Sequence, residues 1–312
     1  MKRYLSIWFP DWPLDRLRRA RLQGRKRSTG KEQAKSARPF VLTETGAKGL
    51  IVIAANVCAR HVGITPGLSF TDARARVPAL IAEAHDPDAD ARALRALADW
   101  MVRYTPLVAL DGADGVMLEI TGCAHLHGGE ASMANRLHAK LTKDGITARI
   151  GVASTPGAAS ALARGSAAGP GASTWRVLPE SETKAGLADL PIATLRLASD
   201  IVILLRRFGL TRIGQLYGID RKALVRRFAS RNAVEAVCLR LDQALGVKVE
   251  PLDPIRPAPD HIARLPCAEP IETLEAIAFG LEKLSKDLSA ELSDLGQAAR
   301  CFCFSAYRAG RL

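Results

Sequence analysis

The chain has 312 residues, 48% hydrophobic and 24% charged, so it is long enough for two or three cores and has the composition of an ordinary globular protein. Its net charge of +12 and pI of about 9.7 favour a polyanionic partner, most plausibly nucleic acid. Its apolar runs are too short to span a bilayer and it shows no signal-peptide pattern, so we expect a cytoplasmic protein, associated with the nucleoid and without a membrane partner.

The N-terminal quarter predicts a strand followed by a long insertion. Residues 3–9, RYLSIWF, are expected to form the first strand, and the next residues begin as a short helix that gives way to a basic loop. Residues 1–40 hold twelve Lys and Arg against three acids. Two apolar runs, PFVLTE and GLIVIAAN, predict a hairpin, and residues 57–78 predict two short helices around a Pro-Gly turn.

The next hundred residues alternate between strand and helix periods. Helices are predicted at 87–104, at 130–144 and from about Pro156, and strands at 80–84, 106–110, 115–121 and 147–154. Without the insertion, this order predicts a mixed sheet of ferredoxin-like type within an α+β fold. The segment GSAAGPGAST at 165–174 then predicts a domain boundary.

A helix-hairpin-helix pattern occupies residues 201–228, within a region that is predicted to be mostly helical. Its glycines would let backbone N–H groups approach DNA phosphates, and basic side chains beside the turn would add charge. We therefore predict DNA contacts from Arg206, Arg207, Gly209, Thr211, Arg212 and Gly214. The zone 206–231 has eight Lys and Arg and one acid, which supports this prediction. The alternative is an ordinary helical hairpin that only packs in a bundle.

The C-terminal residues predict an incomplete domain. Four prolines in 249–261 predict a linker. An amphipathic helix is expected at 271–295, followed by a strand at 299–307, ARCFCFSAY. One helix and one strand make half a domain, so we expect that the chain is truncated.

The six cysteines show no CxxC spacing, and we expect reduced and mostly buried thiols. Cys123, His125 and His127 lie close in sequence. Their spacing fits no common zinc pattern and there is no second ligand pair, so we predict no metal site there.

The order of these elements is similar to that of the Y-family translesion DNA polymerases. The resemblance implies a right-hand fold with a ferredoxin-like palm, inserted fingers, a helix-hairpin-helix thumb, a linker and a partial little finger. These parts would occupy residues 1–11 with 80–166, 12–79, 167–247, 248–261 and 262–312, respectively. In that family, acidic residues at the ends of palm strands hold the metal ions, and a Tyr, an Arg and a Lys bind the incoming triphosphate.

The metal-binding positions of the family are largely lost in this sequence. LSIWFPDW has Trp8 where the first metal-binding Asp stands. GADGVMLEITG keeps Asp114 but has Gly115 in place of the Glu. Nucleotidyl transfer needs two cations held by several carboxylates, and one Asp cannot hold both. Asp11 lies beyond a proline, and Glu119 lies about 13 Å along the strand from Gly115, so neither is expected to substitute.

The nucleotide-binding positions are similarly reduced. AANVCARHVGITPG keeps Arg60 but has Val57 at the Tyr, and RIGVASTPGAA has Pro156 at the Lys. YTPLVAL followed by LEITGCAHLHGGE is typical of the ImuB group, polymerase-like partners of an error-prone replicative polymerase in bacterial damage-induced mutagenesis. We therefore expect no metal and no cofactor, and we expect Asp114 to be a vestige that caps a turn.

These observations favour a non-catalytic DNA-binding adaptor. One alternative is an active low-fidelity polymerase with displaced ligands; another, a helix-hairpin-helix repair enzyme, lacks a candidate nucleophile or base. The resemblance implies a sliding clamp, an error-prone replicative-type polymerase and a RecA-like accessory protein as partners. The segment QLYGI at 215–219 weakly resembles a clamp-binding motif, but it lies inside the hairpin and is expected to pack there.

Overall fold

The computed structural model describes residues 2–24, 38–47, 49–165, 174–219, 231–255, 261–267, 270–299 and 301–307. The chain forms two compact units, Met1–Ile255 and Arg256–Leu312, and each is described by itself. No helix in the described ranges is both long and apolar enough to cross a membrane.

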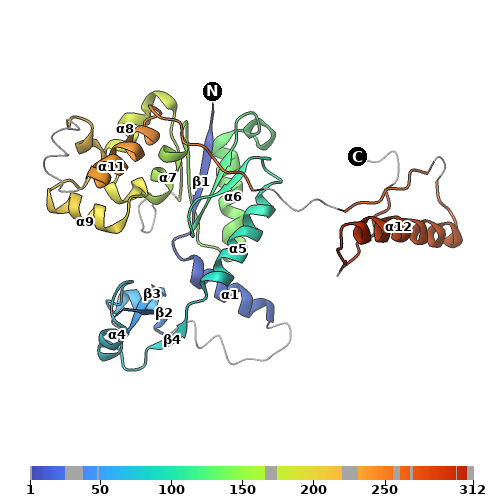
Figure 1. The fold of residues 1–312 in the computed structure, drawn as a ribbon, viewed down its shortest axis with the longest axis horizontal. Helices are drawn as coiled ribbons and strands as arrows, with labels where there is room; N and C mark the ends of the chain where they lie inside the picture. The colour runs from blue at the N-terminus through green and yellow to red at the C-terminus, as the bar shows by residue number, and fades with distance from the viewer. Residues whose placement is uncertain are drawn as a thin grey trace. The chain divides into compact units, whose positions relative to one another are not determined.

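A five-stranded sheet forms the centre of the first unit (Figure 1). Its strand order is β5 (Val108–Leu110), β6 (Gly115–Glu119), β1 (Tyr4–Trp8), β7 (Arg149–Ala153) and β8 (Trp175–Val177). Strand β1 is antiparallel to both β6 and β7, and β8 is parallel to β7. Four of these strands, in the order β5-β6-β1-β7, have the topology of the predicted ferredoxin-like palm. Strand β8 was not predicted.

Helices α5 (Pro87–Met101) and α6 (Glu130–Lys143) cover one face of this sheet. Side chains point to alternate faces along β1, so Leu5 and Ile7 lie on the same face of the sheet. They pack there in one core with Leu94 of α5 and Leu137 of α6. Helix α5 begins where Asp86 accepts a hydrogen bond from the N–H of Ala89. Both helices were predicted from their apolar periodicity.

Helix α7 (Pro156–Gly165) covers the opposite face and packs unusually close to it. A Cβ at Gly151 of β7 would lie 2.3 Å from the carbonyl oxygen of Ala159, so only glycine permits this approach. At the start of α7, a Cβ at Gly157 would lie 2.9 Å from the backbone of Ala244. The position of α7 is therefore tightly fixed by backbone contacts.

A second, three-stranded sheet holds β2 (Phe40–Gly46), β3 (Gly49–Ala55) and β4 (Ile81–Ala84) in the order β3-β2-β4. The β2–β3 hairpin and two short helices, α3 (Val57–His61) and α4 (Phe70–Arg76), follow the prediction for this segment. The sequence assigned residues 80–166 to the palm, which implied that β4 belongs to the palm sheet. This assignment is wrong for β4. The strand pairs in parallel with β2, because Leu80 and Ala82 pack in the core of this small sheet.

The insertion is also anchored to the palm. Helix α1 (Trp12–Gly24), which the sequence assigned to the fingers, buries Trp12 in the core beneath the large sheet. The indole N–H of Trp12 donates to the carbonyl of Asp90 in α5 at 3.0 Å.

The residues after β8 form short helices that pack on α7. These are η3 (Glu180–Glu182), α8 (Thr183–Ala188), η4 (Ile192–Leu195), α9 (Ser199–Arg207), η5 (Ile213–Leu216) and α11 (Arg231–Ala244). In Figure 1, α7 lies between the central sheet and this group, and α7 contacts α8, η4 and α11. The mainly helical character predicted for this region is observed in its described residues.

The proline-rich segment is partly ordered against the palm. The N–H of Ile255 donates to the carbonyl of Val108 in β5 at 2.7 Å, and Pro254 forms an isolated bridge with Ala109. Ile255 is buried in the palm core. Residues up to 255 therefore extend the sheet edge, where the sequence predicted a simple linker.

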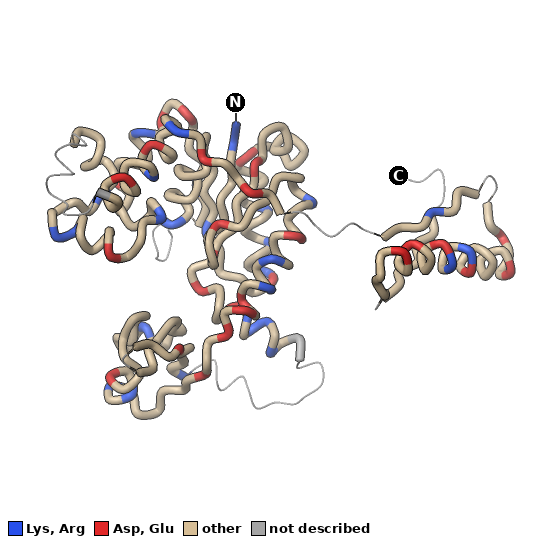
Figure 2. Tube along the Cα trace, viewed as in Figure 1, with Lys and Arg blue, Asp and Glu red and all other residues tan. Residues whose placement is uncertain are grey.

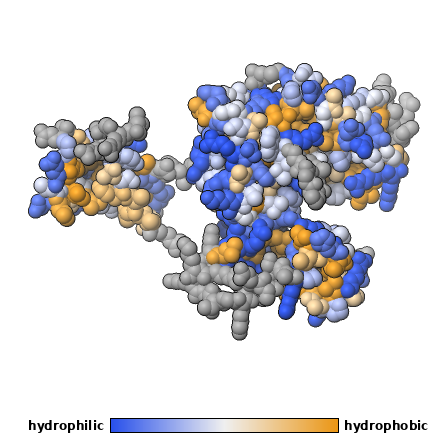
Figure 3. All heavy atoms as spheres, turned by 180° about the vertical axis from the view of Figure 1, so that it is seen from behind, coloured by the Kyte–Doolittle hydropathy of each residue, from blue (hydrophilic) through white to orange (hydrophobic). Residues whose placement is uncertain are grey.

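The second unit contains α12 (Leu274–Asp294), which confirms the predicted amphipathic helix. Its charged residues are mainly acidic, with Lys283 and Lys286 near its middle (Figure 2). Apolar residues lie on the surface of this unit (Figure 3), and Leu274 and Phe279 are among the exposed ones. The predicted strand at 299–307 is wrong, since its described residues have no regular secondary structure. A strand needs a neighbour for its backbone groups, and the described part of this unit contains none.

Candidate functional site

The turn between β5 and β6 lies beside the end of β1. Trp8 of β1 stands directly opposite Gly115 in the antiparallel ladder, and the N–H of Phe9 donates to the carbonyl of Asp114 at 2.8 Å. The N–H of Asp111 closes the turn by donating to the carbonyl of Gly115 at 2.9 Å. The fold thus brings together Trp8, Asp114 and Gly115, the three positions that the sequence resemblance matched to metal-binding residues of the Y family.

The indole of Trp8 binds Asp114 directly. Its Nε1–H donates to Asp114 Oδ2 at 2.8 Å. Two guanidinium groups, those of Arg149 and Arg164, lie 5.4 and 5.5 Å from the centroid of the Trp8 ring, within the range of cation–π contacts. Trp8 therefore places an aromatic ring and a hydrogen-bond donor where an acid stands in the family pattern.

Arg164, in the last turn of α7, forms the principal ion pair of Asp114. Its Nη2 donates to Oδ1 at 2.8 Å and its Nη1 to Oδ2 at 3.2 Å. Nη2 also lies 3.9 Å from Oδ2 of Asp111. The sequence suggested that Asp114 only caps a turn. Both of its oxygens bind side chains, so it does more than that.

Asp111 is a buried carboxylate that sequence reasoning missed. The hydroxyl of Ser160 in α7 donates to its Oδ2 at 2.9 Å, and Nη1 of Arg196 donates to its Oδ1 at 2.8 Å. Arg196 also forms two hydrogen bonds with Glu250, at 2.7 and 2.8 Å. These contacts join the palm turn to η4 and to the segment that follows α11.

Arg196 is held in an unusual backbone conformation. Its φ of 56° is in the left-handed region, and no other non-glycine residue in the described part of the chain has a positive φ. Burial alone would lower the pKa of Arg196, but the carboxylates of Asp111 and Glu250 raise it by more, so its pKa lies above the ordinary value. The ion pairs therefore stabilise both the charge and the conformation of Arg196.

Gly115 leaves no space for the side chain that the family carries there. A Cβ would lie 2.8 Å from the carbonyl oxygen of Asp111 and 3.3 Å from that of Ile7. Both atoms belong to backbone, which cannot rotate away. The glycine is thus part of the packing of this turn.

The remaining acids near the site bind other bases. Asp11 forms two hydrogen bonds with Arg60, at 2.6 and 3.1 Å, which raise the pKa of Arg60 above its ordinary value. Glu119 lies at the far end of β6, opposite Tyr4, and accepts a hydrogen bond from Lys2. The structure therefore places neither acid beside Asp114.

The two other nucleotide-binding positions hold no polar side chain. Val57 lies in α3 near Arg60 and is 57% exposed. Pro156 begins α7 and is buried there. Arg60 is the one member of the family's triphosphate-binding set that this chain keeps, and it is engaged with an acid of the palm.

The predicted hairpin follows α9, and its two glycines have different roles. Gly209 has a φ of +77°, so it forms the turn after α9. Gly214 lies in η5, where a Cβ would be 3.0 Å from both the Cβ and the carbonyl oxygen of Ala188. Gly214 therefore serves the packing of the hairpin against α8. The predicted second helix falls largely at residues 220–230, outside the described residues.

The backbone N–H groups of the turn already have an acceptor. Oε1 of Gln215 accepts from Thr211 at 2.7 Å and from Arg212 at 2.9 Å. Arg206 and Arg207 are exposed in the last turn of α9, and Arg212 is exposed as well, although it donates to the carbonyl of Asp189 at 2.7 Å. Within the described residues of the hairpin, all three arginines thus present their charge to solvent.

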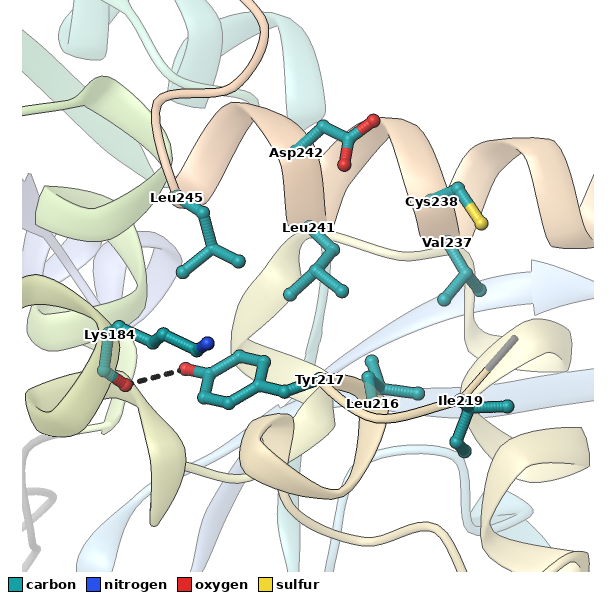
Figure 4. Close-up of a pocket in the computed structure, with 9 residues that line it drawn as sticks. All are labelled: Lys184, Leu216, Tyr217, Ile219, Val237, Cys238, Leu241, Asp242 and Leu245. Carbon is teal, nitrogen blue, oxygen red and sulfur yellow. Dashed lines mark hydrogen bonds between the residues drawn. The ribbon is translucent and has the colours of Figure 1, made fainter. Parts of the chain in front are cut away.

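The segment QLYGI contributes to the packing of the thumb. Leu216, Tyr217 and Ile219 line a pocket of about 170 Å³ that Val237 and Leu241 of α11 close from the other side (Figure 4). The hydroxyl of Tyr217 donates to the carbonyl of Lys184 at 2.8 Å, and burial raises its pKa to about 12. Leu216 is buried, and Tyr217 and Ile219 are half-buried against the core around α7 and α11.

Cys123, His125 and His127 lie in and beside the short helix η2 (Ala124–His127). His127 packs on Tyr104, with 5.3 Å between ring centroids. Throughout the described ranges, no three His, Cys, Asp or Glu side chains are grouped to share a metal.

Comparisons with known proteins find a family model and several relatives to which this chain is similar. The model of the impB/mucB/samB family matches residues 30–164. Over 241 residues, 77% of this chain and 50% of the relative, the chain is 43% identical to Protein ImuB of Caulobacter vibrioides (strain NA1000 / CB15N). The chain is therefore similar to ImuB over most of its own length. It spans about half the length of the curated relatives that it matches.

More distant matches are DNA polymerases. DNA polymerase IV of Moorella thermoacetica is 27% identical over 70% of this chain and 53% of its own length. DinB from Sulfolobus solfataricus superposes with a TM-score of 0.59 at 17% identity, covering 81% of this chain and 69% of that one. A ternary complex of Dbh DNA polymerase gives 0.58 at 18% identity, covering 80% and 69%. The fold is therefore that of the Y-family polymerases.

The Y-family fold implies a pair of divalent cations beside the palm carboxylates, but the side chains of this ImuB-like palm do not fit such a pair. Both oxygens of Asp114 bind Arg164, and both oxygens of Asp111 accept hydrogen bonds from other side chains. Trp8 offers a donor, whereas a hard cation requires oxygen ligands. In this arrangement the two carboxylates bind the guanidinium groups of Arg164 and Arg196.

Proposed function

We propose that this chain is a non-catalytic, DNA-binding adaptor with a Y-family polymerase fold that acts in translesion synthesis and induced mutagenesis. The observation that carries the proposal is the engagement of Asp114 by Arg164 and Trp8. Metal-assisted phosphoryl transfer requires carboxylates that are free to coordinate two cations. The similarity to ImuB supports the same assignment.

Primer extension tests the loss of catalysis. The purified chain should add no nucleotide to a primed template with either magnesium or manganese. Extension that disappears in an Asp114→Ala variant would instead support the alternative, an active low-fidelity polymerase, and would overturn the proposal.

We further propose that the thumb hairpin contacts DNA phosphates through Arg206 and Arg207, with Gly209, Thr211, Arg212 and Gly214 forming the turn that presents them. The exposure of the two arginines and the net charge of +12 support this role. Fluorescence anisotropy with labelled duplex DNA over a range of salt concentrations measures it. Arg136→Ala, which removes an exposed charge from α6 on the other face of the palm, is the matched control.

The domain assignment follows the same proposal. Residues 1–11 with 85–166 form the palm, and residues 38–84 form the fingers, since β4 pairs in the small sheet. Residues 167–247 form the thumb, and 262–312 contribute to a little finger. By resemblance, the adaptor would recruit an error-prone replicative-type polymerase to damaged DNA near the nucleoid, together with a sliding clamp and a RecA-like accessory protein. Co-purification of each candidate with the chain tests these partners.

A further inference from the structure

The two palm carboxylates share one guanidinium group. Arg164 binds both oxygens of Asp114 and lies 3.9 Å from Asp111. The two acids come from a single turn of four residues, and neither binds the other. A cation with fixed geometry thus stands between two like charges, which is the electrostatic role that a metal ion has in an acidic site.

The position of this guanidinium is fixed by the fold. Arg164 ends the tightly packed helix α7, and its neighbour Gly165 approaches so closely that a Cβ would lie 2.7 Å from Leu190. One turn earlier, Ser160 donates to Asp111 and lies 3.4 Å from Nε of Arg164. The Trp8 ring supports the group from another side, 5.5 Å from its carbon. The cation is therefore preorganised and not a mobile surface arginine.

Simple loss of metal ligands does not account for this arrangement. Replacement of two acids by Trp8 and Gly115 would weaken metal binding but would leave the charge of Asp114 uncompensated, because Arg196 pairs with Asp111 and Glu250. Asp114 is 40% exposed, so a cation from solvent could still reach it. The side chain of Arg164 is only 18% exposed and occupies that approach. It neutralises the acids and excludes other cations at the same time.

We infer that Arg164 is the resident cation of the palm site and that its guanidinium holds Asp111 and Asp114 in place of divalent metal ions. This inference rests on the proposed loss of catalysis, and it gives a physical cause for that loss. The site would be insensitive to metals because an internal cation occupies it. Removal of the positive charge frees both oxygens of Asp114, which then form a weak divalent-cation site beside Asp111, while Ser160 and Arg196 still hold Asp111.

Arg164→Gln tests the inference, because it removes the charge and keeps much of the side-chain volume. Thermal unfolding followed by tryptophan fluorescence, with EDTA or with millimolar manganese, measures stability. Manganese electron paramagnetic resonance measures binding directly, without DNA or nucleotide. The wild-type chain should bind no manganese, and its Tm should be the same in both conditions.

The Gln variant should lose about 2–4 °C in Tm in EDTA, since the 40% exposed Asp114 loses its ion pair. It should bind manganese and recover about 1–3 °C of that loss. Arg164→Lys keeps the charge and should bind no manganese. The double variant with Asp114→Asn lacks one of the acids and should also bind none.

Each outcome decides the matter. Manganese binding by the wild-type chain or by Arg164→Lys would overturn the inference, and so would a Gln variant that binds none. Binding that persists in the double variant would place the metal elsewhere and would also overturn it. If Arg164→Gln folds only with manganese present, the inference stands; if it folds in neither condition, the Lys variant must be folded and metal-free. Primer extension by the wild-type chain refutes the proposed function separately, because it is measured independently of manganese binding.

Discussion

Gly115 offers the sharpest test of how the palm turn is packed. Replacing glycine by alanine in a strand normally stabilises a protein by about 0.5–1 kcal/mol, since glycine loses more entropy on folding. At Gly115 the new Cβ would lie 2.8 Å from the carbonyl oxygen of Asp111 and 3.3 Å from that of Ile7. Overpacking against atoms that cannot rotate away costs about 1–3 kcal/mol. The clash exceeds the entropy gain, so Gly115→Ala should lose about 1–2 kcal/mol of unfolding free energy.

Urea denaturation followed by tryptophan fluorescence measures this change. All four tryptophans belong to the first unit, so the signal reports on that unit alone. Gly218→Ala is the matched control, because a Cβ at Gly218 meets no atom within 4 Å. Its unfolding free energy should change little. A Gly115→Ala variant at least as stable as the wild-type chain would show that the turn yields easily, and the packing argument would fail.

The same measurements address three further features. Replacing Arg206, Arg207 and Arg212 by Ala should weaken duplex binding without sequence preference and lower the log–log salt slope by about 0.9 per lost contact; an unchanged slope would mean that the hairpin only packs. Arg196→Ala should cost about 3–5 kcal/mol in urea denaturation, because two buried carboxylates lose their partner, and a loss below 1 kcal/mol would argue against the network. Burial lowers the pKa of His138, so the unfolded chain binds more protons at this residue than the folded chain. The free energy of unfolding should therefore fall as pH drops below about 6.5, and His138→Gln should reduce that dependence. An equal pH dependence in the variant would exclude this histidine as its source.

Much of the palm follows from local sequence patterns. Helical periodicity predicts α5 and α6, and the alternation in RYLSIWF and GVMLEIT predicts the two central strands. Pairing between distant segments is less visible in a single sequence. IAEA at 81–84 reads equally well as a strand of either sheet, and only the contacts of Leu80 place it beside β2. The predicted strand at 299–307 failed for the same reason, since a sequence pattern does not reveal whether a partner strand exists.

The candidate site shows a similar division. The family pattern points to Trp8, Asp114 and Gly115 because each lies within a recognisable motif. The groups that bind Asp114 and Asp111 have no such signal. Arg164 and Arg196 lie 50 and 85 residues from their acids in the chain. Arginines near helix ends are common, and only the packing of α7 and η4 on the palm reveals which carboxylates they meet.

The survival of Asp114 has a physical explanation in these contacts. A carboxylate that has lost its metal ions is a liability in a partly buried site, unless another positive group compensates it. Trp8 and Arg164 supply a hydrogen-bond donor and a charge, so Asp114 stabilises the junction of β1, β6 and α7 without any cation from solvent. Substituting Asp for Trp8 alone should therefore not restore activity. It would remove the donor and place a second acid beside Asp114, at a cost of about 2–4 kcal/mol that urea denaturation measures. A Trp8→Asp variant as stable as the wild-type chain would show that Asp114 does not depend on the indole.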